Sequence, residues 1–412
     1  MYWKKIFLGG VVLAAGATAV FWQDIREVRA LMEYAATFEP EVIDENFRSF
    51  YTQYPAVTIK RGGPVYDLPE ALRDDALPET YTYGDEEKSL SQFLADTQTS
   101  GLLVMQGDAI VYEDYWRGQT AEDRHIIMSI SKSMASMLVG VAVNDGLIDI
   151  EDQVTDYAPS LVGSAYDGVT VKNALEMASG IRWSEDYGRL DSDLVQSLVA
   201  LLLGSLDEFA LGLQREREPG TYNHYASMDT HILGMVLRGA TGKSYQDYFE
   251  EKLWSKLGAE SDAKMLVDSV GEPLVYGGVN IRLRDMARFG KLYLDEGRNF
   301  AGEQLVPASW VKASTTPDAP MLMPMADNPQ SSSGFGYKYQ WWIPFTPDGG
   351  DYSAIGIYGQ FVYVNPKRRV VIAKTTSYLD YNENGGWMNH ETLIAMQAIA
   401  RHLTPDEALA AN

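Results

Sequence analysis

A serine and a lysine stand three residues apart where an apolar turn runs into a helical pattern, within the segment Met128–Met134. The apolar stripe that follows stops at Asn144-Asp145-Gly146, which is typical of a helix end. Side chains at this spacing share one face of a helix, so Ser129 and Lys132 are expected to lie side by side. A neighbouring amine can take the proton of a serine, which is otherwise a poor nucleophile at neutral pH. The pair therefore predicts an activated serine and its base at the start of a helix.

The same Ser-x-x-Lys spacing occurs at Ser261 with Lys264 and at Ser309 with Lys312. Both pairs lie in stretches whose pattern is that of a helix surface or a connection. Ser129 instead follows an apolar approach and opens an apolar helix. The sequence context therefore favours Ser129.

The composition limits the possible functions. The chain has 412 residues, of which 46% are hydrophobic, enough for a substantial core in one large domain or two. It has no cysteine, which excludes disulfides and thiol chemistry, and its net charge of −23 argues against nucleic acid as a partner. The five histidines show no metal-ligand spacing. We therefore expect no metal. The prediction also includes no other cofactor and, from the family resemblance described below, a small-molecule ester or amide substrate, with the oligomeric state left open.

The N-terminus carries Lys4-Lys5 and then an uncharged run of 17 residues, Ile6–Trp22. This pattern predicts a targeting segment, either an uncleaved membrane anchor or a signal cleaved near Ala17-Thr18-Ala19. Because the positive residues precede the run, the body is expected on the periplasmic side of the inner membrane, or in the periplasm or medium after cleavage. The predicted units are residues 1–30 as anchor or signal, 31–98 as an N-terminal extension and 99–412 as the main domain.

Strand patterns occur near both ends of the main domain. A hairpin is predicted for 102–112 around Gly107-Asp108 and another for 361–373, with an aromatic-rich strand at Gly336–Trp342. Helical patterns lie between them, and an amphipathic helix closes the chain; the clearest are Thr170–Met177, Leu194–Leu203, Ile232–Val236 and Asn389–Leu403. The order predicts an α/β (α+β) fold, with one antiparallel sheet built from both ends, flanked by helices, and an inserted all-helical subdomain.

Two further motifs suit the same chemistry. In Tyr225-Ala226-Ser227, a phenol near an amine can relay protons. In Gly356-Ile357-Tyr358-Gly359-Gln360, expected on a strand, small residues let a substrate approach the backbone, where an N–H can stabilise an oxyanion. The aromatic side chains that flank the motifs either line an apolar acyl pocket or belong to the core: Trp183, Tyr187, Trp341, Trp342 and Tyr358.

Taken in order, these motifs resemble those of the β-lactamase-like serine hydrolases, the fold shared by class C β-lactamases, penicillin-binding proteins and family VIII esterases. The resemblance covers about residues 99–405 and is greatest to the 6-aminohexanoate-dimer hydrolase branch. Supporting stretches are Leu175–Ile181, Trp183–Tyr187, Gly277–Asn280 and Tyr339–Trp342.

The resemblance implies a role for each matched position. Ser129 would form an acyl-enzyme, with Lys132 as its proton-accepting amine and Tyr225 as partner in proton transfer. The backbone N–H groups of Ser129 and Ile357 would form the oxyanion hole. The residues expected to contact substrate are Trp183, Tyr187, Asn280, Trp342, Gly356 and Tyr358. The implied activity is hydrolysis of carboxylic esters or amides, and which of Lys132 and Tyr225 is the base stays open.

Two departures from the pattern bear on the substrate. Ser227 stands where β-lactamases and penicillin-binding proteins carry asparagine, and Ala354-Ile355-Gly356 stands where they carry Lys-Thr-Gly. One alternative is a penicillin-interacting D-Ala-D-Ala peptidase or weak β-lactamase. The other is a non-catalytic cell-envelope binding module of the same fold.

Overall fold

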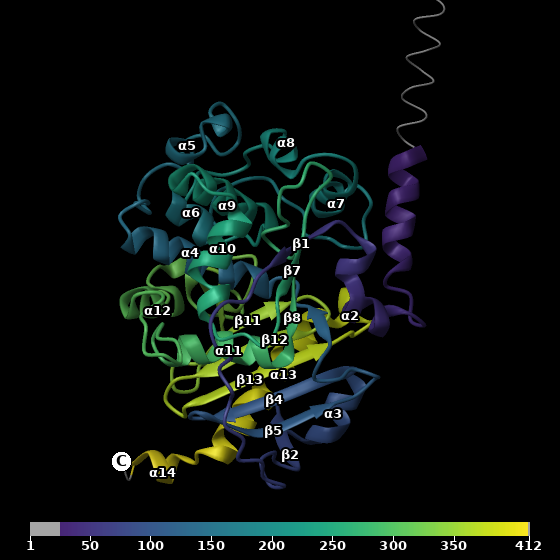
Figure 1. Ribbon diagram of the computed structural model, residues 1–412, viewed down its shortest axis with the longest axis vertical. Coiled ribbons are helices and arrows are strands. Elements are labelled where there is room, and N and C mark those ends of the chain that lie inside the picture. Colours follow the sequence, from purple (N-terminus) through teal and green to yellow (C-terminus); the bar gives the residue numbers. More distant parts are fainter. Residues whose placement is uncertain (1–24, 411–412) are drawn as a thin grey trace, which may run out of the picture.

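The computed structural model describes residues 25–410, in which the strands form three sheets (Figure 1). The largest is a seven-stranded antiparallel sheet in the order β5-β4-β13-β12-β11-β10-β9. Its strands are β4 (Thr99–Gln106), β5 (Ala109–Tyr115), β9 (Gly336–Lys338), β10 (Trp341–Ile343), β11 (Tyr352–Gly356), β12 (Gln360–Asn365) and β13 (Val370–Thr376). Val104 pairs with Ile372, so strands from both ends of the domain meet in one sheet, which confirms the predicted architecture.

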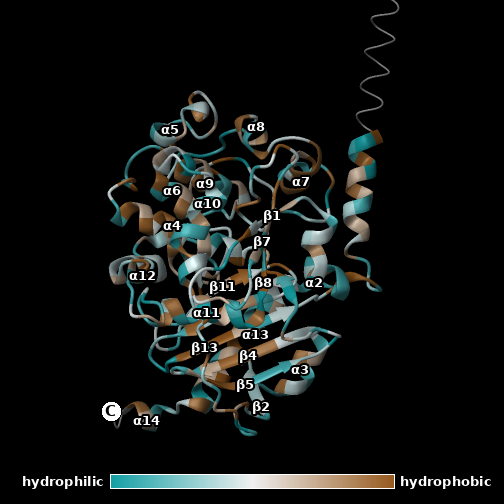
Figure 2. Cartoon of the chain, viewed as in Figure 1, coloured by the Kyte–Doolittle hydropathy of each residue, from teal (hydrophilic) through white to brown (hydrophobic). Residues whose placement is uncertain are grey.

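Helices cover both faces of this sheet. α11 (Leu283–Leu294) packs on β4, β12 and β13, whereas α13 (Tyr381–Leu403) and α3 (Leu90–Asp96) lie against the other face. Side chains alternate along β13, so Val371 and Ala373 join one hydrophobic core and Val370 and Ile372 the other. Figure 2 shows the central strands of the sheet as largely hydrophobic, as burial on both faces requires.

The inserted helical subdomain lies between β6 (Arg124–Ile126) and β7 (Ala263–Leu266). Its first helix, α4 (Ile130–Asn144), is buried from Ile130 to Ala142, and contacts α9 and α12. The other helices of the subdomain are α5 (Val154–Tyr157), η1 (Pro159–Leu161), α6 (Val171–Leu175), α7 (Asp193–Leu203), α8 (Leu206–Leu211), α9 (Ser227–Thr241), α10 (Tyr245–Lys252) and η2 (Trp254–Lys256). The helix α12 (Ala308–Thr315) follows α11 and lies outside the subdomain's part of the sequence.

A second, four-stranded sheet has the order β1-β7-β8-β6 and lies below the subdomain in the view of Figure 1. The N-terminal arm, residues 25–98, supplies first the helix that packs on β6 and then the edge strand of this sheet. In the arm, a helix over residues 25–36 precedes α2 (Ile43–Gln53) and the edge strand β1 (Ala56–Ile59), while β8 (Val279–Arg282) lies inside the sheet. The remaining elements are β2 (Thr80–Tyr83), β3 (Glu86–Ser89), η3 (Pro320–Leu322) and α14 (Asp406–Ala410).

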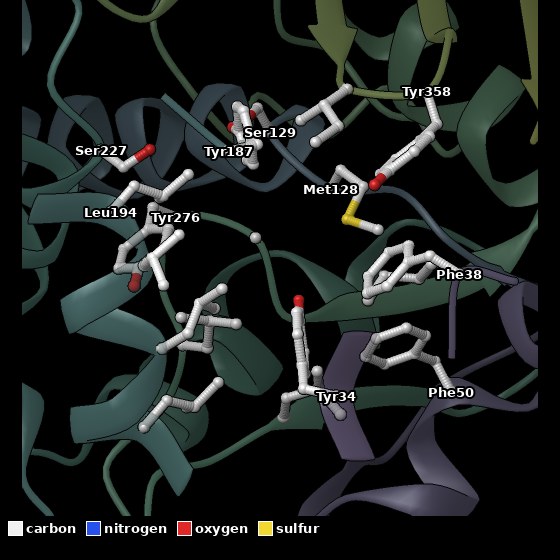
Figure 3. Close-up of a pocket in the computed structure, with 18 of the residues that line it drawn as sticks. Tyr34, Phe38, Phe50, Met128, Ser129, Tyr187, Leu194, Ser227, Tyr276 and Tyr358 are labelled. Atoms are coloured by element: carbon white, nitrogen blue, oxygen red, sulfur yellow. The ribbon is translucent and has the colours of Figure 1, made fainter. Parts of the chain in front are cut away.

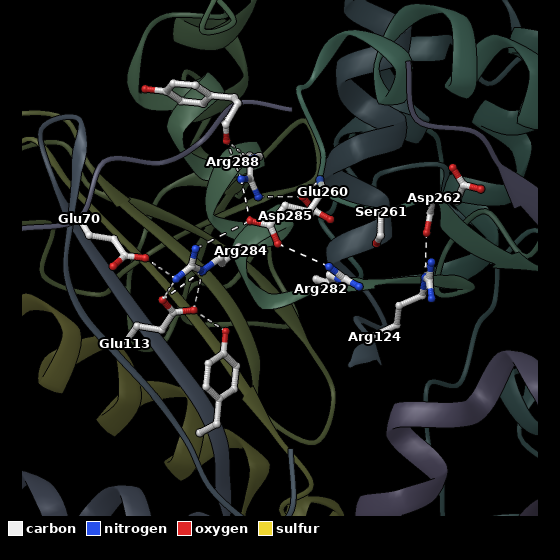
Figure 4. Close-up of polar contacts among 12 residues, drawn as sticks. Glu70, Glu113, Arg124, Glu260, Ser261, Asp262, Arg282, Arg284, Asp285 and Arg288 are labelled. Carbon is white, nitrogen blue, oxygen red and sulfur yellow. Dashed lines mark hydrogen bonds and ion pairs between the residues drawn. The ribbon is translucent and has the colours of Figure 1, made fainter. Parts of the chain in front are cut away.

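A network of charged side chains fixes the arm to the main domain (Figure 4). Arg284 on α11 pairs with Glu70 of the arm at 2.7 Å and with Glu113 of β5 at 2.6 Å. The nearly fully buried Arg288 donates to the Tyr66 carbonyl at 2.6 Å and pairs with Asp285 at 3.0 Å. Because breaking a buried pair leaves an unpaired charge, the network holds the arm in one place on the body.

Several predicted elements differ from the structure in detail. The closing helix begins at Tyr381 rather than Asn389, and the helix capped by Thr170 ends at Leu175. The aromatic segment at Gly336–Trp342 is a hairpin, because Tyr339 and Gln340 take positive φ values of 39° and 69° and reverse the chain.

The segment Gly356–Gln360, expected on a strand, contains the loop between β11 and β12. Tyr358 and Gly359 have φ values of 63° and 92°, which a strand does not allow.

The predicted targeting segment lies outside the described residues. Within residues 25–410, no helix combines the length and hydropathy needed to cross a membrane. The division at residues 30 and 98 stays a prediction.

Close packing of α12 on α4 gives a test of the fold. A Cβ added at Gly140 would lie 2.5 Å from ring atoms of Trp310, whereas nothing lies within 4 Å of one added at Gly386, which is exposed on α13. Gly140→Ala should lower the free energy of unfolding by about 1–3 kcal/mol, and Gly386→Ala should raise it by about 0.5–1 kcal/mol. Urea unfolding measures both, and a Gly140→Ala variant as stable as the parent would contradict this packing.

Candidate active site

Ser129 lies at the N-cap of α4, directly after a strained residue. Met128 has a φ of 50°, a conformation that non-glycine residues rarely adopt and that costs about 1–3 kcal/mol. The approach to this turn is fixed, because the Ile127 N–H donates to the Val279 carbonyl of β8 at 3.0 Å. The turn therefore places a mostly buried serine hydroxyl at the positive end of a helix, beside a cavity.

Lys132 lies one turn into α4, and its amine reaches back to this hydroxyl. Its Nζ is 2.7 Å from Ser129 Oγ and 2.8 Å from the Tyr276 carbonyl oxygen. Burial lowers the pKa of Lys132 to about 7, while the negative charge of Glu185 acts in the opposite direction. An amine with this pKa is about half neutral at pH 7 and increasingly neutral above it, so its lone pair can accept the serine proton.

Tyr225 lies just before α9 and lines a cavity together with Ser129. Its ring stacks on Trp342, with centroids 5.2 Å apart, and the Lys132 Nζ is 5.1 Å from its centroid. Burial raises the pKa of Tyr225 well above its usual value, and a hydrogen bond with Ser129 only partly offsets this. The phenol therefore keeps its proton at neutral pH and is suited to donate it.

Two backbone N–H groups beside Ser129 are available as donors. Neither the Ser129 nor the Ile357 N–H donates to a group within residues 25–410. Gly356 permits their approach, because a Cβ there would lie 2.5 Å from the Ile127 carbonyl oxygen. The hairpin loop after β11 thus reaches the turn that carries Ser129, as an oxyanion hole requires.

Glu185 is a member of this site that the sequence interpretation missed. It accepts hydrogen bonds from the Ser227 hydroxyl at 2.5 Å, the Ser227 N–H at 3.2 Å and the Tyr187 hydroxyl at 3.1 Å, and also from the indole of Trp183. The carboxylate therefore ties the loop at residues 183–187 to the start of α9. The position lies inside a stretch that already resembled the family, but its partners come from distant segments.

Two cavities meet at Ser129. One, of about 270 Å³, is predominantly apolar and extends toward the N-terminal arm and α7 (Figure 3). The other, of about 230 Å³, includes Glu185, Tyr225, Trp342 and Asn389. Ser129, Tyr187 and Ile357 line both, so a substrate bound across the serine would place its two halves in different surroundings.

The structure distributes the expected substrate contacts unequally. Tyr187, Trp342 and Tyr358 line cavities beside Ser129. Trp183 is buried beside Glu185, and Gly356 acts through close backbone approach.

Asn280 is fully buried in β8, where its amide donates to the Gly278 carbonyl at 2.9 Å. It thereby supports the loop whose Tyr276 carbonyl contacts Lys132. Trp341, one of the flanking aromatics, is a core residue packed on Tyr293.

Comparison with known proteins gives consistent results. The family model for β-lactamase matches residues 87–395. A 6-aminohexanoate-dimer hydrolase of Paenarthrobacter ureafaciens is 31% identical over 343 residues, which cover 79% of this chain and 83% of that protein.

Solved structures support the same fold. A Bacillus anthracis protein proposed to be a 6-aminohexanoate-dimer hydrolase superposes with a TM-score of 0.77 at 22% identity, over 88% of this chain and 95% of that one. A family VIII carboxylesterase superposes with a TM-score of 0.56 at 18% identity, over 75% of this chain and 95% of that one.

Proposed function

Because the chain belongs to the β-lactamase family of serine hydrolases, which act on ester or amide bonds, we propose that Ser129 is the nucleophile that its substrate acylates. The observation that carries this proposal is the 2.7 Å contact between Ser129 Oγ and a buried Lys132 whose pKa is lowered to about 7. A buried amine without a carboxylate bonded to it is costly, and here it serves as a base.

The geometry supports a two-step reaction. Lys132 accepts the Ser129 proton as Oγ attacks the carbonyl carbon, and the Ser129 and Ile357 N–H groups stabilise the resulting oxyanion. Tyr225 donates its proton to the departing oxygen or nitrogen and regains one from Lys132. Water then attacks the acyl-enzyme with the same base, which releases the acid and restores Ser129. Because the raised pKa of Tyr225 opposes a phenolate, Lys132 is assigned as the acylation base.

The two alternatives receive less support. Position 354, where β-lactamases and penicillin-binding proteins carry lysine, is a fully buried alanine of β11. It therefore offers no cation for the carboxylate of a penicillin. A binding module would have no need of a lysine kept largely neutral against a serine hydroxyl.

The proposed location follows from the sequence of residues 1–24. The basic residues followed by Ile6–Trp22 support an envelope protein held at the membrane, or released by cleavage, with the catalytic body on the outer side. Fractionation that placed the full-length chain in the cytosol would contradict it.

Replacing the nucleophile gives the direct test. Ser129→Ala should lower the release of p-nitrophenol from p-nitrophenyl acetate by more than about 10³-fold, because no acyl-enzyme can form. The matched control is Ser136→Ala on the same helix, since the buried Ser136 hydroxyl has no hydrogen-bond partner among the described residues. The control should keep full activity. An active Ser129→Ala protein would refute the assignment.

The pH dependence tests the role of Lys132. As the base must be neutral, kcat/KM should rise with pH through an inflection near 7, the pKa of Lys132, and then level off. The Glu185 charge raises that pKa, so Glu185→Gln should move the inflection to lower pH. Asp186→Asn, at an exposed neighbouring carboxylate, should leave it in place. An inflection that stays fixed or moves upward in Glu185→Gln would exclude this electrostatic coupling.

A further inference from the structure

We propose that the larger cavity beside Ser129 binds an uncharged aliphatic acyl chain, and that the N-terminal arm forms one wall of this site. The proposal rests on the assignment of Ser129 as nucleophile and names the substrate class. The cavity, of about 270 Å³, opens directly from Ser129 (Figure 3).

The arm and the helical subdomain face each other across this cavity. The helix over residues 25–36 and the turn after it supply Leu31, Tyr34 and Phe38, while α7 supplies Leu194 and Leu198. Phe38 stacks on Tyr358 with centroids 5.3 Å apart, next to the loop that carries the Ile357 N–H. The arm therefore contributes to the wall beside the loop that carries the Ile357 N–H, although this part of it precedes the residues 87–395 matched by the family model.

Within residues 25–410, the lining has no charged side chain to pair with an ionised group; its polar side chains are those of Ser129, Ser227, Asn382 and five tyrosines. Among the described residues that line the cavity there is no Asp, Glu, Lys, Arg or His. Two of its tyrosines already have partners, since the Tyr276 hydroxyl bonds Ser197 at 2.9 Å and the Tyr54 hydroxyl bonds Thr37 at 2.6 Å. An ionised group bound there would lose its hydration without a counter-ion.

The position of Tyr225 decides which half of the substrate enters. Tyr225 lines the smaller cavity and not the larger one, and in the proposed reaction it protonates the leaving group. The leaving group therefore occupies the cavity that also contains Glu185, Ser332 and Asn389. The acyl chain extends the opposite way, into the apolar cavity.

This arrangement should discriminate between two acyl groups of nearly equal length. A hexanoyl chain buries only methylenes, whereas a 6-aminohexanoyl chain ends in an ammonium group. With an ordinary pKa near 10.4, only about one such amine in a thousand is neutral at pH 7.4. We therefore expect this chain to prefer an uncharged acyl group, unlike the 6-aminohexanoyl group in the substrate for which the relatives are named.

The test measures kcat/KM for methyl esters at pH 7.4, where titration with base follows the carboxylic acid that hydrolysis releases. From acetate to butanoate to hexanoate, kcat/KM should rise by about fourfold per methylene, the factor for burying one CH₂. Methyl hexanoate should exceed methyl 6-aminohexanoate by at least about 100-fold. A flat or falling chain-length series, or equal rates for the last two esters, would overturn the proposal. If the parent protein hydrolysed none of these esters, methyl acetate included, at a rate that depends on Ser129, the result would instead refute the proposed function.

A pair of arm variants tests whether the arm forms the wall. Leu31→Glu places a carboxylate in the lining and should lower kcat/KM for methyl hexanoate by at least about tenfold more than kcat/KM for methyl acetate. Met32→Glu alters the next residue, which is 68% exposed and does not line the cavity, and should match the parent. Equal behaviour of the two variants would exclude the arm from the acyl site.

Discussion

The contact between the Lys132 amine and the Ser129 hydroxyl is the interaction on which the rest of the site depends. An ammonium group is strongly disfavoured where Lys132 lies, and the fall of its pKa from 10.5 to about 7 corresponds to several kcal/mol. The fold tolerates this cost because α4 is packed on all sides and the amine keeps an acceptor in the Tyr276 carbonyl. Stability given up at this point provides a base that is available at neutral pH.

Three separate parts of the fold meet at the Lys132 amine. The turn at Met128 presents Ser129, the β11–β12 loop brings the Ile357 N–H, and the start of α9 brings Tyr225. Glu185 holds the last of these to the loop before α7, and its charge also raises the pKa of Lys132. The Glu185 carboxylate thus affects both the position of the α9 start that carries Tyr225 and the protonation of Lys132.

The sequence predicted what depends on short-range pattern. The spacing of Ser129 and Lys132, the β4–β5 hairpin around Gly107 and the closing helix are local features, and the structure contains each of them. Glu185, the left-handed turn at Met128 and the apolar cavity escaped prediction. Each depends on segments far apart in the chain coming together, as those that carry Leu31 and Leu198 do around the cavity, or on a φ value that the residue type does not indicate. The catalytic assignment of Ser129, Lys132 and Tyr225 agrees with the geometry and awaits measurement.

The most direct measurement of the central claim is covalent trapping with a p-nitrophenyl phosphonate ester, which transfers its phosphonyl group to an activated serine. Mass spectrometry of the digested protein should place one added group on Ser129, and the labelling rate should rise through pH 7 as Lys132 loses its proton. A label on any other serine, or a folded protein that takes up none at pH 8, would contradict the claim that Lys132 activates Ser129.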